Sequence, residues 1–180
     1  MEQKTIQVDL GEGVSANVNK YDLTINGSKG EVTKTLASKQ VTLSVEDNKV
    51  LLTTPSMSKK YKKIVNTFVA HIKNMIKGSQ EGFVYKLKIC SGHFPMNVSI
   101  KDDVLSVKNL FGEKIARELK LKLGSDVKID GEIITVQSNN KEIAGQVAAD
   151  IEKLTRRPGF DNRIFQDGIY ITEKAGKKLK

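Results

Sequence analysis

Apolar and polar residues alternate along several short stretches of the chain, and each stretch predicts a strand with one buried face. In the first third these stretches are residues 14–18, 23–25, 41–45 and 50–52. The dipeptide Asn26-Gly27 lies just after one of them and predicts a turn. The first third therefore reads as an antiparallel sheet.

The apolar spacing then changes from two residues to about four, which predicts helices with one apolar face. The first such stripe comprises Ile64, Phe68, Ile72 and Ile76. Ser58 is its expected N-cap and Gly78 its expected end. A second stripe, which ends before Pro158-Gly159, comprises Ile143, Val147, Ile151 and Leu154.

The second half of the chain repeats the first. With a shift of 82 residues, the segment that starts at Val14 lies over the one that starts at Met96, and Gly30-Glu31 falls on Gly112-Glu113. Any small domain of strands followed by a helix would give some of these matches, but the shared order of strands, turn, strands and helix favours a duplication. The fold class is therefore α+β, with two similar domains, each an antiparallel β-sheet with one helix packed on one face.

The repeat also sets the expected domain boundaries. Residues 1–82 form an N-terminal α+β domain, and residues 83–95 form a connecting strand or linker. Residues 96–180 form a C-terminal α+β domain with a tail that has no counterpart in the first half. That tail contains "RIFQDGIYITEK", in which Asp167-Gly168 predicts either a hairpin turn or a bend before an extended strand.

The positive charge is concentrated in two blocks. The chain has 30 basic and 21 acidic residues, a net charge of +9. Residues 56–100 contain eight basic and one acidic side chain, residues 156–180 contain seven and three, and the rest is nearly balanced. A polyanion partner, a membrane surface and simple solubility all fit a basic chain, but concentration into blocks favours a nucleic acid. Three of the four arginines lie in the last block, and arginine binds phosphate with two parallel hydrogen bonds.

No group of residues predicts an enzyme, a metal site, a cofactor or a small-molecule substrate. Cys90 and His93 are three residues apart, which places them on opposite faces of a strand. Asp102-Asp103 is better read as a turn than as a pair of catalytic carboxylates. The sequence "GSKG" at 27–30 lies between strand-like runs, so it is expected to be a hairpin turn and not the RNA-binding loop of a KH domain.

The expected compartment is intracellular. A single cysteine excludes an intramolecular disulfide, and the N-terminal residues lack the pattern of a secretory signal. No stretch approaches 18 consecutive apolar residues, so no membrane-spanning helix is predicted.

Five blocks of sequence together resemble one known family. They are "NMIKG", "EGFVYKLKI", "SGHFPMNV", "NLFGEK" and "RIFQDGIYITEK". In this order and spacing they are similar to the large-subunit ribosomal protein L6 family, in its archaeal and eukaryotic branch and in archaeal members in particular. The segment "RRPGFDNR" departs from the family pattern, which has a basic residue near Phe160.

The resemblance implies a structural constituent of the large ribosomal subunit, located in the cytoplasmic ribosome. It implies binding to large-subunit rRNA near the translation-factor binding region, and contacts with neighbouring large-subunit proteins. A free-standing module for structured RNA and a protein-interaction scaffold are the alternatives.

The candidate site residues follow from the resemblance and from side-chain chemistry. The candidate RNA contacts are Arg156, Arg157, Arg163, Lys174, Lys177 and Lys178. The residues of the tail motif that are expected to be structural are Phe165, Asp167, Gly168 and Tyr170. The residues that match the family's interdomain motif are His93, Phe94 and Pro95.

Overall fold

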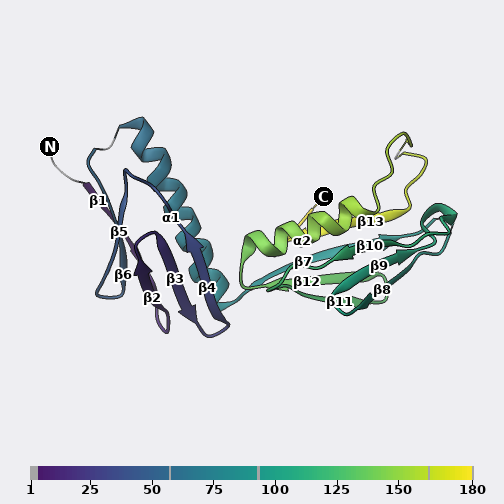
Figure 1. Cartoon of the computed structure of the whole chain (residues 1–180), viewed down its shortest axis with the longest axis horizontal. Coiled ribbons are helices and arrows are strands. Elements are labelled where there is room, and N and C mark those ends of the chain that lie inside the picture. Colours follow the sequence, from purple (N-terminus) through teal and green to yellow (C-terminus); the bar gives the residue numbers. More distant parts are fainter. Residues whose placement is uncertain (1–3, 57, 93, 162, 180) are drawn as a thin grey trace. The chain divides into compact units, whose positions relative to one another are not determined.

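The chain divides into two compact units, residues 1–82 and residues 83–180 (Figure 1). The structure is a computed structural model, and it describes residues 4–56, 58–92, 94–161 and 163–179. Each unit contains antiparallel sheets and one long helix, so the α+β class and the similarity of the two halves are confirmed.

The first unit has two three-stranded sheets and the helix α1 (Lys59–Gln80). One sheet has the order β1 (Lys4–Asp9), β6 (Lys49–Thr54), β5 (Thr42–Glu46). The other has the order β2 (Ser15–Asn19), β3 (Asp22–Gly27), β4 (Gly30–Thr35). All neighbouring strands are antiparallel.

The second unit has a five-stranded sheet, a three-stranded sheet and the helix α2 (Lys141–Leu154). The larger sheet has the order β11 (Asp126–Asp130), β12 (Ile133–Ser138), β7 (Phe83–Cys90), β13 (Gly168–Lys174), β14 (Lys177–Lys178). The smaller has the order β10 (Arg117–Lys120), β9 (Val104–Lys108), β8 (Asn97–Lys101), and a 3-10 turn, η1 (Leu110–Gly112), follows β9.

The strand orders show the duplication directly. The order β1-β6-β5 in the first unit corresponds to β7-β12-β11 in the second, and β2-β3-β4 corresponds to β8-β9-β10. Strands β13 and β14 have no counterpart among the described residues of the first unit, and β13 pairs with the side of β7 that does not face β12. Residues 83–90 of the expected connector are thus the central strand of the second unit's sheet.

The two helices bury stripes that are slightly rotated from the expected ones. In α1 the buried apolar residues are Val65, Phe68, Ile72 and Met75, whereas Ile64 and Ile76 are only partly buried. In α2 the buried residues are Ala144, Val147, Ala148 and Ile151. A spacing of four residues drifts by about 40° at each step around a helix of 3.6 residues per turn, so a strict four-residue stripe leaves the core at its ends.

The "GSKG" segment is a hairpin turn, as predicted, and it also holds the end of α1. Gly27 pairs with Gly30, where β3 turns into β4. The Lys29 N–H donates to the Ser79 carbonyl oxygen at 2.8 Å. The helix runs past the expected stop at Gly78 to Gln80, and its last carbonyl groups are satisfied partly by this turn.

We expect Gly27→Ala to lower the free energy of unfolding by about 1–3 kcal/mol. A Cβ at Gly27 would lie 2.7 Å from the backbone oxygen of Ser79, so the hairpin or the helix end must shift. Urea titrations followed by circular dichroism measure the change. Ser28→Ala is the matched control, because it removes only one hydroxyl hydrogen bond, to the Gln80 carbonyl oxygen. Equal stability of Gly27→Ala and wild type would show that this close approach is not rigid.

Candidate nucleic-acid interface

The carboxylate of Asp167 fixes the start of the tail strand. Asp167 is only 7% exposed. Its Oδ1 accepts the N–H of Gly92, and its Oδ2 accepts the N–H of Phe94 at 3.5 Å. A Cβ on residue 92 would come within 3.2 Å of Oδ1, so glycine at this position lets the carboxylate approach the backbone. The tail is therefore tied to the segment that follows β7.

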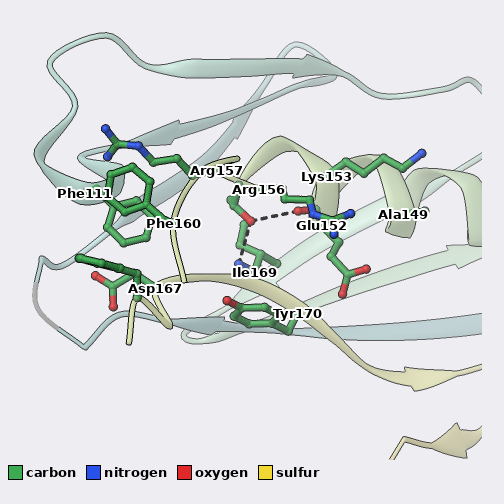
Figure 2. A pocket seen from close by; sticks show the side chains of 12 residues that line it. Phe111, Ala149, Glu152, Lys153, Arg156, Arg157, Phe160, Asp167, Ile169 and Tyr170 are labelled. Atoms are coloured by element: carbon green, nitrogen blue, oxygen red, sulfur yellow. Dashed lines mark hydrogen bonds between the residues drawn. The ribbon is translucent and has the colours of Figure 1, made fainter. Parts of the chain in front are cut away.

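Two side chains from the end of α2 hold the outer edge of β13, and Figure 2 shows one of the two hydrogen bonds, at Ile169. The Ile169 N–H donates to Thr155 Oγ1 at 3.0 Å, and the Ile171 N–H donates to Glu152 Oε1 at 3.0 Å. These two backbone donors face away from β7, where an edge strand leaves its N–H groups unpaired. The side chains of α2 thus take the place of a further strand.

Three phenylalanines and an arginine pack together beside this edge. The ring centroids of Phe160 and Phe165 are 4.9 Å apart in a T-shaped contact, and each lies 6.1 Å from the centroid of Phe111. The Arg157 guanidinium lies over the Phe160 ring at 4.1 Å and over the Phe111 ring at 5.6 Å. This cluster fixes the loop between α2 and β13 onto the turn η1.

Phe111 reaches the cluster through an unusual backbone conformation. Its φ is 50°, in the left-handed region that residues other than glycine rarely adopt, and Asn109 and Gly112 on either side also have positive φ. The Asn109 side chain donates to the Pro95 carbonyl oxygen at 3.0 Å. The "NLFG" segment is therefore held by side-chain contacts in a shape that its own propensity disfavours.

Arg117 joins the turn after η1 to the end of α2. Its guanidinium donates to both carboxylate oxygens of Glu113, at 2.7 and 2.8 Å. The same guanidinium donates to the carbonyl oxygens of Leu154 at 2.7 Å and Arg156 at 3.2 Å, which lie at the C-terminal end of α2. A cation is favourable at this end of a helix dipole. The hydrogen bonds from Arg117 are the main reason that the pKa of Glu113 lies below its ordinary value.

The lowered pKa of Glu113 predicts a pH-dependent contribution to stability. A carboxyl group with a lowered folded-state pKa stabilises the protein above its ordinary pKa of about 4.3, and the contribution disappears as the pH falls through the lowered value. Glu113→Gln is expected to reduce the free energy of unfolding by about 1 kcal/mol at pH 7. The variant and the wild type are expected to converge in acid.

Urea titrations at several pH values measure this difference. Glu118→Gln removes an exposed carboxylate from the neighbouring strand β10 and is the matched control. A Glu113→Gln deficit of the same size at pH 7 and in acid would contradict the assigned role of the ion pair.

The six candidate RNA contacts fall into three environments. Arg157 is packed in the aromatic cluster, and Arg163 forms an ion pair with Asp161 at 2.8 Å although its side chain is 90% exposed. The side-chain hydrogen bond from Arg163 is the main cause of the lowered pKa of Asp161. The other four are exposed and form no ion pair or side-chain hydrogen bond within the described part of the chain; we name them the tail cations, and they are Arg156, Lys174, Lys177 and Lys178.

The tail hairpin does not turn at Asp167-Gly168. It turns at Ala175-Gly176, where φ is 49° and 84°, and joins β13 to β14. Gly168 is instead the first residue of β13, and a Cβ there would lie 3.3 Å from Tyr170 Oη and 3.4 Å from Thr155 Oγ1. Burial is the main cause that raises the pKa of Tyr170.

Two of the three residues that match the family's interdomain motif contact other parts of the second unit. Phe94 and Pro95 lie in the second unit and contact Asp167 and Asn109 through their backbones. His93 lies outside the described residues. Thr155, Glu152 and Arg117 were not among the candidates, because each acts on a backbone group that is distant in the sequence and leaves no local pattern.

The first basic block divides between the two units. Six of its eight lysines lie on α1, which contains no acidic residue. The other two are on β7 and are neutralised, with Lys86 3.0 Å from Glu173 and Lys88 3.9 Å from Glu132.

Over residues 4–56, 58–92, 94–161 and 163–179, no helix is long and apolar enough to cross a membrane. The same ranges contain no group of three or more His, Cys, Asp or Glu side chains arranged to hold a metal ion.

Comparison with known proteins identifies the family. The family model for ribosomal protein L6 matches residues 10–82. The chain is 42% identical over 171 residues to large ribosomal subunit protein uL6 of Haloquadratum walsbyi, covering 93% of this chain and 94% of the relative. The uL6 proteins of Halobacterium salinarum and Methanococcus vannielii are 40% and 41% identical over 172 and 173 residues, covering 96% of this chain and 97% and 95% of theirs. As the resemblance of the five blocks predicted, the chain belongs to the ribosomal protein L6 family.

Proposed function

We propose that this chain is a structural constituent of the large ribosomal subunit in the cytoplasmic ribosome, and that its second unit binds large-subunit rRNA. The observation that carries the proposal is the similarity over nearly the whole length to three archaeal relatives, each named as a large ribosomal subunit protein. Those names describe ribosomal components and not enzymes, which agrees with the absence of catalytic groups from the sequence patterns.

The arrangement of the tail cations supports an RNA surface in the second unit. The register of the β13–β14 hairpin places Lys174 directly opposite Lys177. Like charges at opposed positions of two strands destabilise a hairpin on its own, and a phosphate group placed between them removes the repulsion. A tail that is anchored at Asp167 and carries unpaired cations is thus suited to hold a folded RNA by its backbone.

Two further contacts are part of the proposal. Arg163 is exposed beside Asp161 and exchanges this carboxylate for a phosphate when RNA binds. Arg157 keeps its place over Phe160 and presents the outer edge of its guanidinium. The position near the translation-factor binding region, and contacts with neighbouring ribosomal proteins, follow from the family resemblance and complete the proposal.

The proposal is tested by the location of the chain in cells of its source. A tagged chain is expected to sediment with large subunits on a gradient at low salt, and to leave them as salt is raised, since phosphate contacts weaken steeply with ionic strength. A chain that binds RNA but stays at the top of the gradient would be a free-standing RNA-binding module. A chain whose association hardly responds to salt would be a protein-interaction scaffold.

A further inference from the structure

The end of α2 and the tail enclose a pocket, and two of the proposed RNA contacts, Arg156 and Arg157, are among the residues that line it. Its volume is about 320 Å³, within the range of about 300–1,000 Å³ that is typical of small-molecule sites. Figure 2 shows its walls: Phe160 and Phe111 lie on one side, and Ile169 and Tyr170 on the other. The pocket lies between the loop after α2 and the edge of β13 described above.

The walls combine aromatic, apolar, acidic and basic side chains. Phe111, Phe160 and Phe165 supply aromatic rings, and Ala149 and Ile169 supply apolar carbon. Two carboxylates, Glu152 and Asp167, disfavour an anion inside. Lys153 and Arg156 stand at the side of the pocket formed by the end of α2. A ligand that fits is flat, uncharged in its buried part, and attached to a phosphate outside.

The hydrogen-bonding atoms of the pocket walls further limit which ligands can fit. Both oxygens of Asp167 accept backbone N–H groups, and Thr155 Oγ1 both accepts and donates a hydrogen bond. Glu152 uses Oε1 for the Ile171 N–H, and its Oε2 has no hydrogen-bond partner within the described ranges. The Tyr170 hydroxyl is also without a hydrogen bond among the residues that the structure describes. A carboxylate oxygen and a hydroxyl that line the pocket are thus each without a hydrogen-bond partner among the described residues.

We propose that this pocket receives one unstacked nucleobase of the bound RNA, with its amino edge toward Glu152 and its ring against the phenylalanines. Proteins commonly recognise unpaired RNA bases by aromatic contacts combined with hydrogen bonds to the base edge. Guanine fits best, because its N1–H and its amino group are adjacent donors, and Glu152 Oε1 has a second lone pair beside the one that accepts the Ile171 N–H. Uracil offers only one donor on this edge, its N3–H, and the carbonyl oxygens on either side of that donor would also face the carboxylate. The inference rests on the proposed function, since the base comes from the RNA that the tail cations bind.

Nuclear magnetic resonance titration of the full chain with 5′-GMP tests the pocket without ribosomes. At millimolar 5′-GMP, the methyl signals of Ala149 and Ile169 are expected to shift together with signals of Tyr170. Ribose 5-phosphate is expected to shift only Lys153 and Arg156, because it has no base. 5′-UMP is expected to bind about tenfold more weakly than 5′-GMP, which is the cost of losing a charge-assisted hydrogen bond.

Two variants decide the assignment. Glu152→Gln keeps an oxygen for the Ile171 N–H but removes the charged acceptor, so 5′-GMP should bind about tenfold more weakly and 5′-UMP should be little affected. Ala149→Leu fills the pocket from α2 and should abolish the Ile169 shift. Protection of the Ile171 amide from hydrogen exchange checks that β13 stays anchored in both variants.

The proposal is overturned if 5′-GMP leaves the pocket signals in place, if 5′-UMP binds equally well, or if Glu152→Gln leaves the affinity for 5′-GMP unchanged. These outcomes are independent of sedimentation. If the chain sediments with large subunits but does not bind 5′-GMP, only the base pocket is contradicted. If it binds 5′-GMP in the pocket but does not sediment with large subunits, only the ribosomal role is contradicted.

Discussion

Replacing all four tail cations by glutamine is expected to weaken binding to large-subunit rRNA on the order of a hundredfold at moderate salt. With each lost phosphate contact, fewer counterions are released when the RNA binds. The slope of log affinity against log salt, which is negative, should therefore become less steep by about 3. Filter binding or fluorescence anisotropy across a salt series measures both quantities. The change should leave folding intact, because the four side chains are exposed and unpaired in the described part of the chain.

The first unit supplies a control with the same change in charge. Four exposed lysines begin α1, and replacing them by glutamine also removes four positive charges: Lys59, Lys60, Lys62 and Lys63. If rRNA binds through the second unit, this control should weaken affinity far less than the tail variant does. Equal losses in the two variants would mean that net charge, and not the tail surface, governs binding.

Asp167→Ala is expected to lower the free energy of unfolding of the second unit by about 2–3 kcal/mol. The substitution leaves the N–H groups of Gly92 and Phe94 without their acceptor, at a site where the carboxylate is almost fully buried. The loop before β13 then loses its tie to the end of β7, so affinity for rRNA should fall as well. Urea unfolding and hydrogen exchange at the Gly92 and Ile169 amides measure the loss.

Asp167→Asn is the matched control for this anchor. Asparagine has nearly the same shape and keeps one side-chain oxygen for the Gly92 N–H. Asp167→Asn should therefore retain more than half of the stability that Asp167→Ala loses. An alanine variant with unchanged exchange at Gly92 would show that the carboxylate does not hold the segment after β7.

The fold was largely predictable, because its signals are local. Alternation in steps of two residues marked the strands, and a repeat of 82 residues showed that the same arrangement occurs twice. The alternating run at 83–90 was recognised as a strand, but its place was not. It is the central strand only because it pairs with both β12 and β13. The apolar pattern of a strand does not indicate which strands it pairs with.

The candidate interface was less predictable, because its contacts join distant residues. Asp167 and Gly92 are 75 positions apart, and Ile169 and Thr155 are 14 apart. The tail turn was misplaced for a different reason. An Asp-Gly dipeptide is a strong turn signal and an Ala-Gly dipeptide a weak one, yet Ala175 takes the positive φ because pairing of β13 with β14 fixes the register.

Strand β13 has a consequence for the chain before it meets any partner. Without β13, β7 would expose a full row of backbone donors and acceptors along an edge that carries Leu87 and Ile89, now 0% and 9% exposed. Such an edge is a template for pairing with other copies of the same chain. We therefore expect the tail to protect a newly made chain from aggregation, and a chain cut before Gly168 should precipitate even in the absence of RNA.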